Sequence, residues 1–270
     1  MTEVVERWSD RVVRVLAPNP SPMTLEGTNT YVVGEPGAGA VVVIDPGPAD
    51  AGHQLRVIEA CAGRRVDLVL LTHAHQDHAE GAPELARRAA APLVALDPAW
   101  HGQGAPPLVP GRRLPGGGLE LLPVATPGHS ADHCCFLLAA ERAMFTGDHV
   151  LGRGTTVVEW PGGDMGDYLR SLSMLLDYDL ERLYPGHGPL VDDAAAKIDE
   201  YIDHRRQRER QVLDALGAGD RTPAQVVARV YAAVDPALHP AAELSVRAHL
   251  VKLVREERVK VVGDDYQLAP

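Results

Sequence analysis

Three histidines and an aspartate stand within six residues, directly behind an apolar run. The run covers residues 66–71, and His73-Ala74-His75-Gln76-Asp77-His78 follows it after one threonine. Imidazole is the commonest metal ligand in proteins, and a carboxylate beside it suits a divalent ion. Four candidate ligands this close cannot all reach one tetrahedral ion without straining the turn, so their number indicates two metals.

The same order of strand, small residues and ligand-type side chain recurs three times downstream. The apolar runs 119–124, 143–146 and 183–184 lead to His129, Asp148 and His187. In open α/β layers, functional residues gather outside the carboxyl ends of strands, and a neighbouring glycine lets the backbone come close to an ion. We therefore expect these side chains to converge on one site.

These motifs resemble those of the metallo-β-lactamase superfamily of dinuclear metal hydrolases. The resemblance covers about the first 195 residues, and Asp45-Pro46-Gly47 also fits the family's early D-x-G turn. It implies an α+β protein with four αββα layers and two divalent ions. By that resemblance the ligands are His73, His75 and His129 for one ion, Asp77, His78 and His187 for the other, and Asp148 as the bridge. Zinc is the default for a histidine-rich site, with iron or manganese as alternatives.

Asp77 and Asp148 are the predicted catalytic residues. Two divalent ions bring four positive charges, and the two carboxylates and one hydroxide remove three. The site would stay cationic and suit an anionic transition state. Two close ions also lower the pKa of the water between them, so a metal-bridging hydroxide is the expected nucleophile and Asp77 would orient it.

The composition shifts near residue 195, which predicts a catalytic domain over 1–195 and a linker helix with a further domain over 196–270. A helix over 194–216 precedes Thr222, a predicted helix cap. Another helix over about 241–257 and a hairpin over 259–268 complete a winged helix. Two roles are open for this module. In the first it binds nucleic acid through a basic helix face, and in the second it packs on the catalytic domain. The basic face would comprise Arg247, His249, Lys252 and Arg255.

The net charge favours the packing role. The chain carries 26 basic and 37 acidic residues, a net charge of −11, and residues 196–270 hold 12 of each. The first 195 residues therefore carry the whole imbalance, and groove-binding modules are usually strongly basic. An acidic catalytic domain argues against tight polyanion binding, although bound metals invert the local field.

Residues 19–31, with the sequence NPSPMTLEGTNTY, are similar to the N-terminal motif of β-lactamase-like proteins that carry a C-terminal winged helix. A mitochondrial member of that branch cleaves single-stranded RNA, so the resemblance implies an RNA phosphodiesterase. Thr28 and Asn29 would lie at the rim of the metal site, with Asn29 and His133 as substrate-facing residues. His149 is expected to be structural or near the pocket, and not a ligand. A purely structural role for the turn at residues 27–29, and for His133, stays open.

The main alternative is a glyoxalase II-like thioester hydrolase, which uses the same ligands but has glutathione-binding helices that this chain does not match. A secreted β-lactamase fits less well, and a non-catalytic binding module would not need the complete ligand set. Residues 1–7 have no signal-peptide pattern, no run is apolar enough to span a membrane, and Cys61, Cys134 and Cys135 suit a reduced core. We therefore expect a cytoplasmic phosphodiesterase that acts on single-stranded RNA, with hydrolysis of a small thioester as the alternative; the oligomeric state stays open, a homodimer included.

Overall fold

A computed structural model describes residues 4–270. Residues 1–3, part of the stretch judged above to lack a signal peptide, lie outside the described residues. The chain groups into two compact units. Unit 1 comprises the residues up to Thr126 with Asp132–Gly154 and Asp179–Ala195, and unit 2 comprises Pro127–Ala131, Thr155–Tyr178 and Ala196–Pro270. Unit 2 thus includes two segments from the first 195 residues, and a domain boundary after residue 195 stays a prediction.

Unit 1 contains a six-stranded sheet in the order β1-β2-β3-β4-β5-β6. Its strands are β1 (Val5–Arg7), β2 (Val12–Leu16), β3 (Asn29–Val33), β4 (Ala40–Ile44), β5 (Arg65–Leu70) and β6 (Leu93–Val94). The first four strands are antiparallel neighbours, whereas β4, β5 and β6 run parallel. Every residue of β4, with the sequence AVVVI, is buried, as expected for a strand covered on both faces. The parallel arrangement brings the ends of β4 and β5 to one edge, where Asp45 and the histidine cluster follow.

The second sheet of unit 1 has five strands in the order β11-β10-β9-β8-β7. They are β7 (Leu114–Gly116), β8 (Leu119–Ala125), β9 (Cys134–Leu138), β10 (Ala143–Gly147) and β11 (Arg182–Pro185), with a short 3-10 turn at Ala139–Glu141. Only β10 and β11 are parallel. Their carboxyl ends carry Asp148 and His187, so these two predicted ligands leave neighbouring strands at the same edge.

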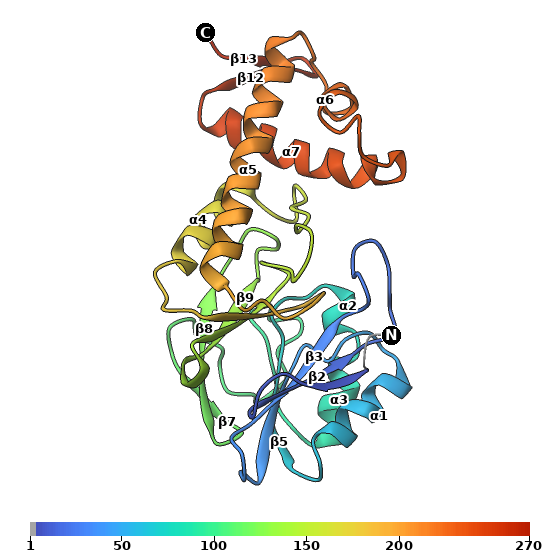
Figure 1. The fold of residues 1–270 in the computed structure, drawn as a ribbon, viewed down its shortest axis with the longest axis vertical. Coiled ribbons are helices and arrows are strands. Elements are labelled where there is room, and N and C mark those ends of the chain that lie inside the picture. The colour runs from blue at the N-terminus through green and yellow to red at the C-terminus, as the bar shows by residue number, and fades with distance from the viewer. Residues whose placement is uncertain (1–3) are drawn as a thin grey trace. The chain divides into compact units, whose positions relative to one another are not determined.

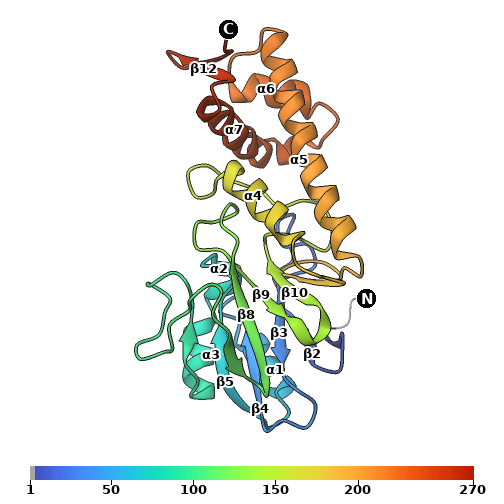
Figure 2. The same cartoon turned by 90° about the vertical axis from the view of Figure 1, so that its left-hand side faces the viewer.

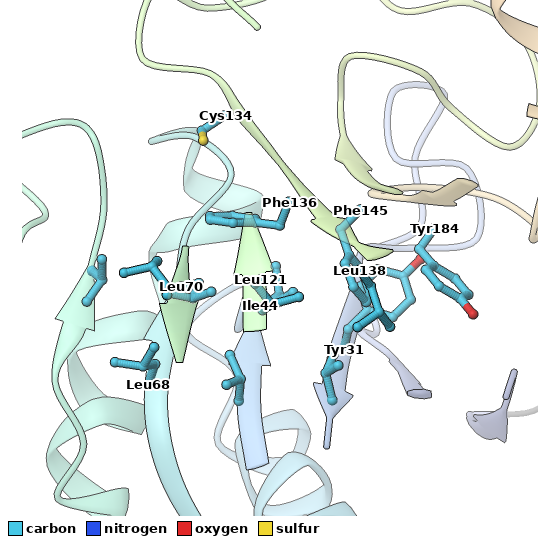
Figure 3. Close-up of a cluster of buried hydrophobic side chains, with 14 of the residues drawn as sticks. Tyr31, Ile44, Leu68, Leu70, Leu121, Cys134, Phe136, Leu138, Phe145 and Tyr184 are labelled. Carbon is cyan, nitrogen blue, oxygen red and sulfur yellow. The ribbon is translucent and has the colours of Figure 1, made fainter. Parts of the chain in front are cut away.

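A buried apolar cluster joins the two sheets. Tyr31, Ile44 and Leu70 of the first sheet pack with Phe136 and Phe145 of the second, and Figure 3 shows these side chains facing one another. Since the chain has only two phenylalanines among its few aromatic residues, aliphatic side chains fill most of the remaining space. This packing fixes the strands from whose ends the candidate ligands project.

The outer face of the first sheet is covered by helices α1 (Ala51–Ala60) and α3 (Ala82–Ala89), which lie beside its strands in Figure 1. Val57 of α1 and Leu85 of α3 are fully buried against valines of β4 and β5. Asp50 caps α1 by accepting a hydrogen bond from the His53 backbone N–H. The short helix α2 (Gln76–Ala79) lies within the histidine cluster itself.

Unit 2 contains the helices α4 (Met165–Leu175), α5 (Ala194–Gly217), α6 (Pro223–Val230) and α7 (His239–Arg255), a 3-10 turn at Pro236–Leu238, and the hairpin of β12 (Val259–Val262) and β13 (Asp265–Leu268). As predicted, Thr222 caps α6, in a capping box with Gln225. One buried cluster joins the end of α5 with α6, α7 and β12, and Figure 2 shows these elements together. The expected three helices and hairpin are therefore present.

All three cysteines are buried and free. Burial raises the pKa of Cys61 to about 11 and the pKa of Cys135 to about 12, so these thiols behave as small apolar side chains at neutral pH. Over residues 4–270, no helix has the length and apolarity that a membrane span requires.

Candidate metal centre

The histidine cluster is anchored to the strand before it by one carboxylate. Asp45, at the end of β4, accepts hydrogen bonds from the backbone N–H and the hydroxyl of Thr72, at 2.8 and 2.7 Å. Asp45 has a φ of 50°, in the left-handed region that is unusual for a residue other than glycine. The sequence marked this turn only as a motif, whereas the structure shows that its side chain fixes the start of the cluster.

Four predicted ligands of unit 1 converge. Donor atoms of Asp77, His78, Asp148 and His187 all lie within 4.8 Å of one another. Asp148 Oδ1 is 3.2 Å from Nε2 of both His78 and His187, and Asp77 Oδ2 is 3.2 Å from Nε2 of His187. A Cβ atom on Gly186 would lie 2.7 Å from Asp148 Oδ1, so only glycine leaves room for this approach.

The two histidines of this group present their Nε2 atoms to each other at 3.2 Å. His78 Nδ1 lies 2.9 Å from the Asp45 carboxylate and His187 Nδ1 lies 3.1 Å from the Gly27 carbonyl. Both partners accept hydrogen bonds only, so each Nδ1 carries a proton and each Nε2 is turned toward the carboxylates. Two Nε2 atoms beside two carboxylates can be satisfied by protons or by a cation between them, and a divalent metal ion fits this donor set.

The electrostatics of the group lead to the same conclusion. Burial opposes protonation of His187, but chiefly Asp148 overrides it and raises the pKa to about 9. The pKa of His78 is likewise raised well above its usual value against the effect of burial, through Asp148, Asp77 and Asp45. Burial disfavours an ionised Asp148, but His187 and His78 hold its pKa well below the usual range. The pocket thus binds positive charge strongly, either as protons or as a metal ion.

A second group shares Asp148. Donor atoms of His73, His75 and Asp148 also lie within 4.8 Å of one another, and the ring centroids of His73 and His75 are 4.5 Å apart. The Thr72 hydroxyl lies 3.0 Å from His73 Nδ1, which leaves Nε2 as the ligand atom of that ring. Asp148 therefore belongs to both groups, as expected of a bridging ligand.

His129, the remaining predicted ligand, belongs to unit 2. Its Nδ1 lies 2.8 Å from the carbonyl oxygen of Val157, so Nε2 is again the nitrogen left for a metal. The turn before it needs glycine, because a Cβ on Gly128 would lie 2.3 Å from the Tyr168 Cα. The role of His129 as a ligand stays a prediction, as do the roles of the other ligands.

His133 lies next to His73 of the second group and belongs to neither ligand set. Its ring centroid is 5.1 Å from that of His73, it is fully buried, and its Nδ1 is 2.8 Å from the Thr126 hydroxyl. His149 is also buried, with its ring 5.7 Å from that of His133. Supporting roles suit both rings, and contact of His133 with a substrate stays a prediction.

Asn29 holds the loop that carries His187. Its side-chain N–H groups donate to the carbonyl oxygens of Pro185 and Gly188 at 3.0 and 2.9 Å, and its backbone N–H donates to Gly186. The Tyr31 hydroxyl donates to Pro185 as well. Asn29 and Tyr31 therefore clamp the loop, which nothing in the sequence alone indicated. That Asn29 also faces the substrate stays a prediction.

The predicted basic face of α7 is used within unit 2. His249 is 1% exposed, Lys252 is paired with Glu209 and Glu256, and Arg247 is paired with Glu243. Arg255 is paired with Asp164 and lies over the Trp160 ring, 4.9 Å from its centroid. The four groups are therefore buried or neutralised by carboxylates.

Fold and site together define a hydrolase with clustered histidines and aspartates that could hold metal. Residues 23–187 match the model of the metallo-beta-lactamase superfamily, and residues 222–267 match the beta-lactamase associated winged helix domain. The chain belongs to the metallo-β-lactamase superfamily and carries its associated winged helix. The predicted α+β fold and the assignment as a hydrolase are thereby confirmed.

Curated relatives match nearly the whole chain. It is 36% identical to a beta-lactamase-like protein 2 homolog of Caenorhabditis elegans, over 94% of this chain and 88% of the relative. It is 37% identical to an atrochrysone carboxyl ACP thioesterase of Aspergillus chevalieri, over 96% and 83%. A metallo-beta-lactamase family protein of Thermus thermophilus shares the fold, with a TM-score of 0.82 at 22% identity over 97% of this chain and all of that one.

Proposed function

We propose that this protein is a metal-dependent thioester hydrolase. The observation that favours a thioester over a nucleic acid as the substrate is that helix α7, described over its whole length, has no free basic face. The cationic groups that would hold a nucleic acid there are buried or paired, as described above for Arg247, His249, Lys252 and Arg255. A chain with a net charge of −11 offers little to a polyanion without such a face. A relative that is named a thioesterase and matches nearly the whole chain supports the same choice.

The candidate site suits hydrolysis of an acyl thioester. Two divalent ions, zinc being our first choice and iron or manganese the alternatives, would be held by the seven predicted ligands and would supply Lewis-acid stabilisation of negative charge. Asp77 is the most exposed carboxylate of the group, at 29%. Burial opposes its ionisation, but His78 and His187 lower its pKa, so it can accept a hydrogen bond from an attacking water. Asp148 stays ionised deep in the site and fixes both groups.

Cleavage of single-stranded RNA is the second candidate. It is favoured by the resemblance of residues 19–31 and of the winged helix to the endoribonuclease branch. A phosphodiester could use the same ligands, because two ions can clamp the attacking and leaving oxygens. The RNA would have to bind away from the paired face of α7, and its binding should be weak and sensitive to salt. A cytoplasmic location and a homodimer stay predictions of the sequence.

The test is a parallel assay of the metal-loaded protein on S-lactoylglutathione, a carrier-protein thioester, single-stranded RNA and a chromogenic β-lactam. We expect turnover of at least one thioester, loss of that turnover in His73→Ala and Asp77→Ala, and no loss in the control His101→Ala, a half-buried histidine outside both groups. Cleaved RNA with intact thioesters would replace this proposal with the second candidate. Hydrolysis of the β-lactam alone would refute both.

A further inference from the structure

Unit 1 contains a cavity of about 480 Å³ that none of the seven predicted metal ligands lines. It lies where β1, β2 and β3 meet the residues that follow the His187 loop, and its walls include Glu6, Arg14, Leu16, Asn29 and Leu190. Small-molecule sites usually have volumes of about 300–1,000 Å³, so the space suits a small ligand.

The cavity is lined by an arginine with unused hydrogen-bond donors. The Arg14 side chain is 3% exposed, and its Nη2 donates to the carboxylate of its cross-strand neighbour Glu6 at 2.6 Å. Its guanidinium carbon lies 5.3 Å from the Trp8 ring centroid. Within residues 4–270, Arg14 Nε and Nη1 have no hydrogen-bond partner. Arginine stays charged even when buried, so unsatisfied N–H groups of this kind indicate a missing acceptor.

The charges around the cavity leave room for one anionic group. Arg7, Arg14 and Arg153 line it together with Glu6 and Glu26. Hydrogen bonds from Trp8 and Arg14 lower the pKa of Glu6, and the hydrogen bond from Arg153 lowers that of Glu26, so both carboxylates are ionised at neutral pH. Three arginines against two carboxylates give one net positive charge, in a chain whose total is −11. A carboxylate balances it, whereas a phosphate monoester near −2 would leave excess negative charge.

The rest of the wall is apolar. Leu16, Pro189 and Leu190 stand in the same cavity as the arginines, so the ligand should carry a short apolar part beside its anionic head. We propose that this cavity binds a small organic carboxylate, with its head on Arg14 and its apolar tail against these three residues. The site is separate from the predicted metal centre and from the reaction proposed there.

Isothermal titration of the full chain tests the proposal with three probes, hexanoate, hexan-1-ol and inorganic phosphate. Each is titrated into metal-loaded and metal-depleted protein, because a carboxylate could also bind the ions. We expect hexanoate to bind at one site in both preparations, and hexan-1-ol and phosphate to bind at least about tenfold more weakly. Hexanoate binding that needs the metal, equal affinity for the alcohol, tighter binding of phosphate or no hexanoate binding would each overturn the proposal.

Two variants locate the site. Arg14→Lys keeps the charge but loses the planar fork, and should weaken hexanoate binding about tenfold. Arg153→Ala, at a residue 58% exposed on the rim, should fold normally and weaken binding a few-fold. The matched control is Arg142→Ala, since Arg142 is also a half-exposed arginine paired with carboxylates but does not line the cavity. Unchanged affinity in Arg153→Ala together with unchanged affinity in a folded Arg14→Lys would refute the assignment.

Discussion

Acidification should weaken unit 2 through its buried histidine His249. His249 lies in α7, is 1% exposed, and has no hydrogen-bond partner for either ring nitrogen among the described residues. Burial, followed by the charges of Arg205 and Lys252, lowers the pKa of His249 from its usual value near 6.5 to about 3. The ring is therefore neutral in the folded chain at pH 5, where an exposed histidine would be protonated.

The expected loss of folding stability follows from the difference between the pKa of His249 in the folded and in the unfolded chain. Between pH 6.5 and about 3 the unfolded chain binds a proton that the folded chain does not, so stability is present above pH 6.5 and falls as the pH decreases. At about pH 5 the unfolded pKa lies 1.5 units above the solution pH, which corresponds to about 2 kcal/mol at 1.36 kcal/mol per unit. The whole contribution, about 5 kcal/mol, would be lost only below pH 3.

The test compares the free energy of unfolding of the parent with that of His249→Leu at about pH 7.5 and about pH 5. Denaturant unfolding is monitored by far-ultraviolet circular dichroism. Leucine cannot titrate and replaces two unsatisfied nitrogens with methyl groups, so the variant should match or exceed the parent at the higher pH. At the lower pH it should gain about 2 kcal/mol relative to the parent. Other titrating groups cancel in this difference. Val246→Ala, a buried change in the same helix, should destabilise equally at both values. A difference between His249→Leu and the parent that does not change with pH would refute the reasoning.

Two further predictions concern the metal centre. Asp148→Ala removes the carboxylate shared by both groups. Elemental analysis should therefore show a fall from about two metals per chain to one or fewer, and turnover should fall at least about 100-fold. Undiminished metal content would contradict the role of Asp148 as a bridge. Asp45→Asn removes the carboxylate that holds His78 Nδ1 and should weaken metal affinity about 10- to 100-fold in a chelator competition. Asp67→Asn, whose carboxylate serves Arg65 and Gly117 instead, is its control, and equal affinities in the two variants would exclude this role for Asp45.

Elements that are determined by residues close together in the sequence could be predicted. The valine run of β4 and the polar residues that follow β5, β10 and β11 are visible in the sequence, since the apolar pattern shows where strands lie and where they end. The start of α6 was equally local, because Thr222 and Gln225 are three residues apart and bond to each other's backbone. The predicted ligands of unit 1 carried a local signal as well, since each follows the carboxyl end of a strand, and the packing of the two sheets then brings them together.

Contacts between distant residues could not be predicted in this way. Asn29 clamps residues more than 150 positions away, and Asp45 reaches His78 across 33 positions. A sequence shows that an amide or carboxylate is available, but the choice of partner depends on which strands become neighbours. Asn29 was therefore predicted to face a substrate, while its two side-chain hydrogen bonds are made with the loop that holds His187.

Helix α7 shows how this limit affects an inference about function. Its basic residues have the composition of a nucleic-acid-binding helix, but Lys252 pairs with Glu209 of α5 and Arg255 pairs with Asp164 at the start of α4. The Arg255 side chain is 55% exposed, so its pair adds little stability, yet both pairs take up positive charge that phosphate binding would use. His249, which precedes both cations in the helix, stays neutral because it is buried. The helix thus uses its polar groups for packing within unit 2, which is why we place substrate recognition at the metal centre and not on the winged helix.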